Sequence, residues 1–332
     1  MSTFLQFLFG GLVSGAIFAL IALGWVLIYN VSGVLNLAQG EFVMIGALVF
    51  VELRGTYELP VLVSIAGAVA AAVAVAVVLD IVILRRLRND QMVPMVLVTV
   101  GASVVLREIA QEIFGKDPLR TKPLLDGDPL SIGGATVLPH TLLLWATVVV
   151  LVLLLTLFFA RSLVGKAMRA CHENALGAQV VGVSPQRMRT AAFALSAALG
   201  AIAGVLIVPV TSMSWNGGTA LGLKGFVAAT FGGLGSLPGA VVGGIAIGII
   251  EALAAGYVSS AYKDVFATLV LLALLLARPQ GLLGASQRDE RVGGGLVPRL
   301  SAAMRTRTGG RGGSAAQQGA VTDGEPPTRE NP

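Results

Sequence analysis

Three polar side chains interrupt an otherwise apolar part of the sequence. Asn36, Gln39 and Glu41 lie within residues 30–47, NVSGVLNLAQGEFVMIGA, between apolar segments. Two amides and a carboxylate can bind a polar solute, and non-helical backbone at membrane depth is tolerated where it is buried in protein or lines a cavity. We therefore predict that these residues line a translocation path. The alternative is a short interfacial loop between two ordinary spans.

A fourth candidate is Glu251, a carboxylate in the apolar, glycine-rich stretch 225–251. An acid inside a membrane needs a partner whether it serves transport or only structure. Glu251 is therefore either another residue of the path or a buried structural carboxylate paired with a helix end or a hydroxyl. Arg107, near the end of the apolar run 93–114, either reaches the membrane interface or touches the path.

Motifs for catalysis, nucleotide binding and metal binding are missing from the sequence. Neither Lys116 nor Lys166, each preceded by glycine, is followed by Ser or Thr, so no phosphate-binding GxxxxGK[ST] loop is formed. The single cysteine, Cys171, excludes internal disulfides and cysteine-based metal clusters, and His140 and His172 lie in different loops. A Gly-x-Ser-x-Gly nucleophile motif is also absent. We expect no catalytic residue, metal or cofactor in this chain.

The composition is that of a membrane protein. Of 332 residues, 55% are hydrophobic and only 12% are charged, and the mean hydropathy is +0.83. Soluble domains usually carry about 25% charged residues. The net charge of +5 is small, and the basic residues gather in particular loops, which is a topology signal. We expect the lipid bilayer, and no nucleic acid, as a partner.

Apolar runs long enough to cross about 30 Å of hydrocarbon recur along the chain. They cover residues 6–29, 61–84, 93–114, 138–160, 190–209 and 262–277. The stretch 225–255 is predicted to form a hairpin that turns near Gly235–Pro238 and has a short first arm. The sequence thus predicts an all-α, polytopic membrane protein with about eight to nine transmembrane helices, some of them short or broken. A small β-hairpin around Gly133–Gly134 is expected on the outer face.

The basic residues also predict the orientation and the domain boundaries. Loop 161–189 has five basic residues against one acid, which places it in the cytoplasm, and residues 115–139 then lie outside. Residues 1–283 form the predicted transmembrane permease domain. Residues 284–332 are rich in Gly, Arg, Ser and Pro and are predicted to be a disordered cytoplasmic tail.

Small residues recur every four positions in two of the apolar runs. This spacing lets the backbones of two membrane helices approach closely. The predicted packing positions are Gly200, Gly204, Gly235, Gly239 and Gly243.

The loop 161–189 is more than a tether between two spans. Residues 166–181 can form one helix whose apolar face is small, and Gly182 then ends it. Ser184 suits an N-cap and Pro185 the first position of the next helix. The predicted small face consists of Met168, Cys171, Ala175 and Ala178. Such an ordered loop suggests a docking surface.

Three segments together resemble the LivH-type permease subunits of branched-chain amino-acid ABC importers. They are residues 30–47, residues 173–206 and residues 224–253, and the similarity covers about residues 4–283 in the same order. The resemblance implies a multi-pass subunit in the bacterial inner (plasma) membrane. It implies three kinds of partner: a second, LivM-like permease, two ATP-binding cassette ATPases that use the ATP, and a periplasmic amino-acid-binding protein.

The resemblance also implies a role for part of the cytoplasmic loop. The segment from Glu173 to Gly182, which includes Asn174, Ala175 and Ala178, is similar to the EAA-type segment through which importer permeases engage their ATPases. Asn174 departs from a strict Glu-Ala-Ala pattern. The predicted cargo is a branched-chain or related hydrophobic amino acid. The alternatives are urea or a short amide carried by the same machinery, or a stand-alone secondary transporter or channel.

Overall fold

The computed structural model describes residues 2–86, 92–125, 127–132, 135–278 and 280–283. The tail predicted at 284–332 lies outside these residues. In chain order the helices are α1 (Ser2–Ser32), α2 (Gln39–Gly55), α3 (Val61–Val82), η1 (Leu84–Arg86), α4 (Met92–Phe114), α5 (Pro139–Arg161), α6 (Leu163–Glu173), α7 (Ala175–Val180), α8 (Pro185–Ile207), α9 (Gly217–Gly232), α10 (Leu237–Tyr257), η2 (Ser260–Tyr262) and α11 (Lys263–Ala277).

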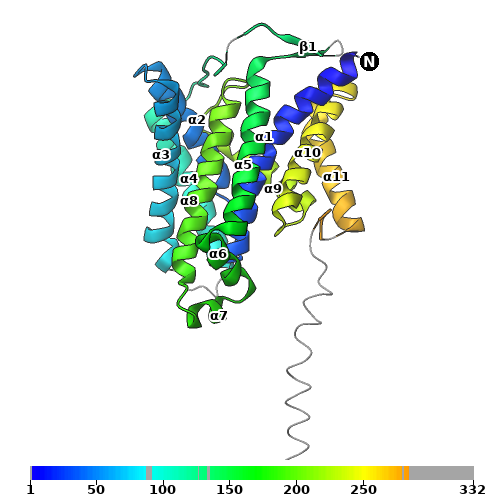
Figure 1. Ribbon diagram of the computed structural model, residues 1–332. Coiled ribbons are helices and arrows are strands. Elements are labelled where there is room, and N and C mark those ends of the chain that lie inside the picture. The colour runs from blue at the N-terminus through cyan, green and yellow to red at the C-terminus, as the bar shows by residue number, and fades with distance from the viewer. Residues whose placement is uncertain (1, 87–91, 126, 133–134, 279, 284–332) are drawn as a thin grey trace, which may run out of the picture. The chain divides into compact units, whose positions relative to one another are not determined.

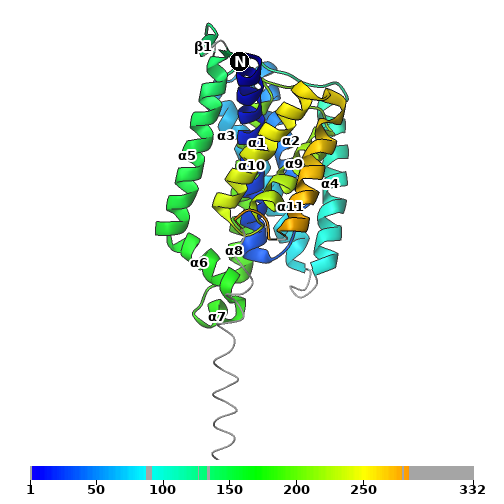
Figure 2. The same cartoon turned by 90° about the vertical axis from the view of Figure 1, so that its right-hand side faces the viewer.

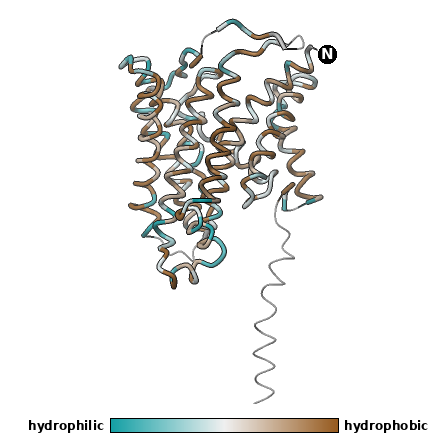
Figure 3. The backbone as a smooth tube through the Cα atoms, in the orientation of Figure 1, coloured by the Kyte–Doolittle hydropathy of each residue, from teal (hydrophilic) through white to brown (hydrophobic). Residues whose placement is uncertain are grey.

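The long helices form a bundle with polar segments at its two ends (Figures 1 and 3). Within the described residues, seven helices are long and apolar enough to cross a membrane. Two more apolar helices, α2 with 17 residues and α9 with 16, are shorter. The predicted all-α polytopic architecture, with some short or broken helices, is confirmed.

The two ends of the bundle carry different structures. Strands β1 (Leu130–Ile132) and β2 (Ala135–Val137) pair antiparallel at one end, as predicted, and α6 and α7 lie at the other (Figure 1). The hairpin is held to the start of α1, because the Gln6 side chain donates to the Thr136 carbonyl at 3.3 Å and accepts from the Thr136 N–H at 2.9 Å. The loop expected outside and the loop expected inside therefore lie at opposite ends.

Helix α1 is central, whereas α5 stands at an edge of the bundle (Figure 2). In their most apolar windows, 83% of α1 is buried within the chain and 17% of α5. Small residues allow this burial: a Cβ added at Gly248 of α10 would lie 2.2 Å from the backbone nitrogen of Gly15 in α1. Such contacts leave no room for a side chain.

The predicted packing glycines fall into two groups. A Cβ at Gly204 would lie 2.1 Å from the Val43 carbonyl oxygen in α2, and Gly200 is looser, at 3.2 Å from the Phe42 Cβ. Gly239 and Gly243 face α9, where an added Cβ would lie 2.5 Å and 2.2 Å from carbonyl oxygens.

Gly235 is a correction. It lies in the turn between α9 and α10 with φ +106°, so the turn needs a glycine there for its backbone conformation rather than for helix packing. Helix α9 ends at Gly232 and α10 begins at Leu237, so the hairpin turns where the sequence predicted.

Candidate translocation and coupling sites

The chain is non-helical between α1 and α2, at the place where the sequence predicts a break. Helix α1 ends at Ser32, Gly33 has φ +67°, and α2 begins only at Gln39. Asn36 stabilises the turn, because its Oδ1 accepts from the Ala38 N–H at 3.2 Å. Asn36, Gln39 and Glu41 are all 0% exposed. The structure thus brings these three residues together, closed off from water in this conformation.

Gln39 joins the break to α8. The Ser196 hydroxyl lies 2.6 Å from Gln39 Oε1 and 2.9 Å from the Gly24 carbonyl oxygen, so it can donate to either. The Gln39 Nε2 donates to the Ser196 carbonyl at 3.3 Å. A Cβ at Gly24 would lie 2.2 Å from this Nε2, so glycine makes room for the amide.

Glu41 joins the break to α4 and α9. Its Oε1 accepts from the Ser103 hydroxyl at 2.8 Å and the Thr219 hydroxyl at 2.9 Å, and the Arg107 Nε lies 3.9 Å away. Its Oε2 has no hydrogen-bond partner among the described residues, and neither has the Arg107 Nε. A carboxylate and a guanidinium therefore face one another with bonding capacity to spare, which is the pairing that a zwitterionic solute requires.

Glu251 belongs to a different set of contacts. It is 7% exposed and forms a salt bridge with Lys224 of α9, and the Lys263 Nζ lies 3.7 Å from its Oε1. Lys224 also pairs with Asp264 at 2.9 Å. These contacts join α9, α10 and α11 and fit the structural alternative, but the predicted partner, a helix end or a hydroxyl, is wrong, because Glu251 pairs with lysines.

The loop 161–189 differs from its prediction in two respects. Residues 166–181 form two helices, α6 and α7, because the Asn174 side chain accepts from the Gly177 N–H at 2.8 Å and starts a new helix. Ala178 is buried and Ala175 is exposed, so they do not form one small face. Glu173, the last residue of α6, is exposed.

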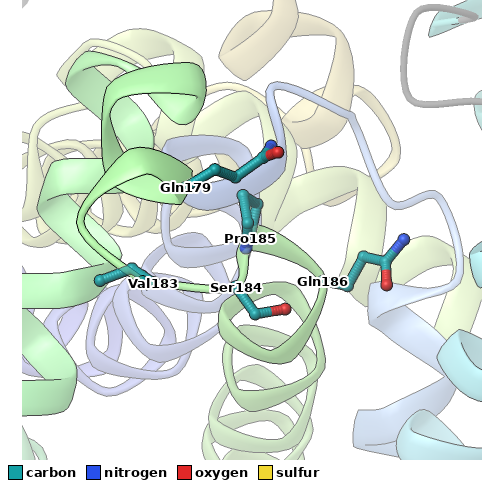
Figure 4. Close-up of a pocket in the computed structure, with 6 residues that line it drawn as sticks. Gln179, Val183, Ser184, Pro185 and Gln186 are labelled. Atoms are coloured by element: carbon teal, nitrogen blue, oxygen red, sulfur yellow. The ribbon is translucent and has the colours of Figure 1, made fainter.

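Gly182 ends this element with φ +86°, a conformation that favours glycine. The next helix, α8, begins at Pro185 after Ser184, although the Ser184 side chain makes no capping hydrogen bond. A hollow of about 380 Å³ lies at this turn, and Gln179, Ser184 and Gln186 point to one side of the turn while Val183 points to the other (Figure 4).

Asp80 of α3 is a buried charge that the sequence analysis missed. It is 0% exposed, and its carboxylate pairs with Arg189 of α8 at 2.7 Å and with Arg85 at 3.5 Å. Thr190 of α8 also donates to it. The missed signal is an acid within an otherwise uncharged apolar run, which requires a basic partner. This cluster joins α3 to the helix that follows α7.

A family model described as "Branched-chain amino acid transport system / permease component" matches residues 7–275. The chain belongs to this permease family. It is 33% identical to the high-affinity branched-chain amino acid transport system permease protein LivH of Escherichia coli K12, covering 86% of this chain and 97% of that protein. It is 32% identical to the permease protein BraD of Pseudomonas aeruginosa, covering 86% and 98%.

Among solved structures, the chain is similar to PsaBC from Streptococcus pneumoniae in complex with Fab, with 14% identity, a TM-score of 0.47 and coverage of 86% of this chain and 95% of that one. Family membership makes this chain a multi-pass transport permease and not an enzyme. As a subunit of an ABC transport system, it works with ATPase and solute-binding partners.

Proposed function

We propose that this permease imports branched-chain amino acids as zwitterions along a path beside the start of α2. The observation that carries this proposal is the pair formed by Glu41 and Arg107, 3.9 Å apart, each with an atom that makes no hydrogen bond among the described residues. The solute ammonium would bind Glu41 and its carboxylate would bind Arg107. Urea and short amides have no such pair of charges, so this geometry favours an amino acid over them.

Opening of the path requires movement of α4. Helix α4 reaches the break through hydrogen bonds: Ser103 donates to Glu41, and Thr99 accepts from the Leu37 N–H at 3.2 Å. On its other side α4 borders an apolar groove of about 760 Å³ shared with α3. Hydrogen bonds exchange with solute and water at small net cost, whereas closely packed backbones do not separate easily. Displacement of α4 would therefore expose Glu41.

The energy source would act on α7 and the turn that follows it. On α7 and directly after it, three apolar side chains are exposed: Leu176 is 76% exposed, Val180 87% and Val181 76%. Exposed apolar side chains beside the hollow at Gly182–Gln186 suit a protein contact. We assign this contact to an ATP-binding cassette ATPase. A second ATPase of the same kind would bind a second, LivM-like permease. A periplasmic amino-acid-binding protein would deliver the solute to the opposite end.

The test is uptake by vesicles that contain the two permeases, the two ATPases and the binding protein. We expect ATP-dependent accumulation of leucine, with isoleucine and valine competing and urea not competing. Accumulation of urea without leucine would replace the cargo and leave the machinery intact. Uptake without ATP or the ATPases would instead support a secondary transporter.

A further inference from the structure

A second pocket lies outside the proposed path and borders the proposed ATPase contact, because Glu173 belongs to both. It is formed by α6, the end of α1 and the α9–α10 turn, and its volume is about 310 Å³. We call it the α6–α10 pocket. Its size falls at the lower end of the range for small-molecule sites, about 300 to 1,000 Å³. It would therefore suit a ligand as small as an amino acid.

The rim of the α6–α10 pocket carries two opposite charges. Arg169 and Glu173 are four residues apart on α6, both line the pocket and both are exposed. In the described chain no salt bridge joins them, and the Arg169 guanidinium instead donates to the Phe159 carbonyl. A carboxylate and a guanidinium that do not neutralise one another remain free to bind a ligand with two charges.

The rest of the lining is mainly apolar. Met168 is buried, and Val31, Phe159 and Leu237 are partly buried. These side chains come from α6, α1, α5 and α10, so the apolar part is built from four elements of the fold. An aliphatic side chain placed on them would leave water, which is worth about 0.8 kcal/mol for each CH₂ group buried.

We propose that the α6–α10 pocket binds a free branched-chain α-amino acid from the cytoplasm and that the bound ligand slows import. Arg169 binds the carboxylate, Glu173 binds the ammonium, and Met168, Val31 and Leu237 contact the aliphatic side chain. The identity of the ligand as the imported solute, and the cytoplasmic side of the pocket, rest on the proposed function. The product of transport would thus limit its own accumulation.

The position of the pocket explains why binding would slow transport. One wall is α6, which precedes the proposed ATPase contact, and another is the start of α10. The Asn30 Nδ2 donates to the Gly235 carbonyl at 2.9 Å, so the end of α1 and the α9–α10 turn are already joined. A ligand that touches both walls binds best when they are close, and so it opposes any step that separates them.

Binding is tested on the purified four-subunit complex without the binding protein. We expect leucine to raise its melting temperature, and expect no shift with leucinamide or 4-methylpentanoate, each of which lacks one of the two charges. Arg169→Gln and Glu173→Gln each lower the affinity for leucine about tenfold, because each removes a charge-assisted hydrogen bond. Lys166→Gln changes an exposed residue of α6 that does not line the pocket, and this control should keep the affinity for leucine. Equal affinity in all four proteins would overturn the proposal.

Regulation is tested by loading vesicles with leucine before ATP-dependent uptake of labelled leucine begins. Each variant is compared with its own uptake into empty vesicles, so a change in basal activity does not enter the ratio. We expect internal leucine to inhibit wild type and Lys166→Gln, and to inhibit Arg169→Gln and Glu173→Gln only at about tenfold higher concentration. Equal inhibition of wild type and the three variants by internal leucine would show that the α6–α10 pocket does not regulate uptake. If the complex carries urea and not leucine, the proposed function fails while the binding test still decides the pocket.

Discussion

Two regions of the molecule are held together by different forces. Helices α1, α2, α8, α9 and α10 form what we call the glycine-packed core: a Cβ at Gly46 of α2 would lie 2.3 Å from the Ala201 Cα in α8. The α3–α4 side is open: a Cβ at Gly101 of α4 would have nothing within 4 Å and faces an apolar groove of about 760 Å³. The helices of the core have no space in which to shift, whereas α4 has open space beside it.

The difference indicates where movement is inexpensive. Separating closely packed helices forfeits many small dispersion contacts at once. Helix α4 reaches the α2 break through a few hydrogen bonds, each worth a net 0.5 to 1.5 kcal/mol or so, and water or solute can replace them. We therefore assign rigidity to the core and movement to α4.

The largest effect is expected from a bulky residue in the core. Gly248→Leu forces the backbones of α1 and α10 apart, because even the Cβ would lie 2.2 Å from the Gly15 nitrogen. We expect no folded complex after purification in detergent. The same change at Gly101 should leave yield and melting temperature unaltered. Equal yields of the two variants would show that the core tolerates separation.

The next largest effect concerns the contact between the two regions. Asp80→Asn removes the buried carboxylate that pairs with Arg189, and breaking such a buried pair typically costs about 3 to 5 kcal/mol. We expect a clearly lower melting temperature. Arg85→Gln removes a weaker, half-exposed partner and should cost less. A larger fall in melting temperature for Arg85→Gln than for Asp80→Asn would show that Arg189 is not the main partner of Asp80.

A third prediction separates transport from stability at the α2 break. Glu41→Gln keeps an oxygen that accepts from Ser103 and Thr219, so the melting temperature should change little. Leucine uptake should fall at least tenfold, because the solute ammonium loses its charged partner. Glu251→Gln is the control: it loses the Lys224 salt bridge and should lower stability more than specific uptake. The opposite pattern would make Glu251 the transport residue.

The smallest effect is expected at the ATPase contact. Leu176→Glu places a charge at a position that the ATPase would cover, so the charge would be buried in the contact. It should lower leucine-stimulated ATP hydrolysis about fivefold. Gly182→Val should act similarly, since Gly182 has φ +86°. Leu130→Glu makes the same change on the hairpin at the opposite end and is the control. Wild-type hydrolysis in Leu176→Glu and Gly182→Val would remove α7 from the contact.

Features set by local sequence were predictable. The break before Gln39, the turn at Gly235 and the β-hairpin follow from glycines and polar residues whose effects act over a few positions. The division of loop 161–189 was also predictable, because Asn174 is a good N-cap, but the small apolar spacing around it favoured one continuous helix. Small-residue spacing did not separate Gly235, which serves a turn, from Gly239, which serves packing.

Features set by distant partners were not predictable. Asp80 meets Arg189 across 109 positions, and Ser196 meets Gln39 across 157. Apolar runs predict that helices exist, but they do not predict which helix faces which. Glu251 remained ambiguous for the same reason, since its partner Lys224 lies on another helix, beyond a turn.

The central claim is that the core stays rigid while α4 moves, and distances between spin labels test it directly. Labels are placed at Ile113 at the end of α4, Val210 after α8 and Val258 after α10, all exposed, with Cys171 replaced by alanine. On ATP binding by the complete complex we expect the Val210–Val258 distance to stay constant and the Ile113–Val258 distance to change. A change of equal size in the Val210–Val258 distance would contradict the account.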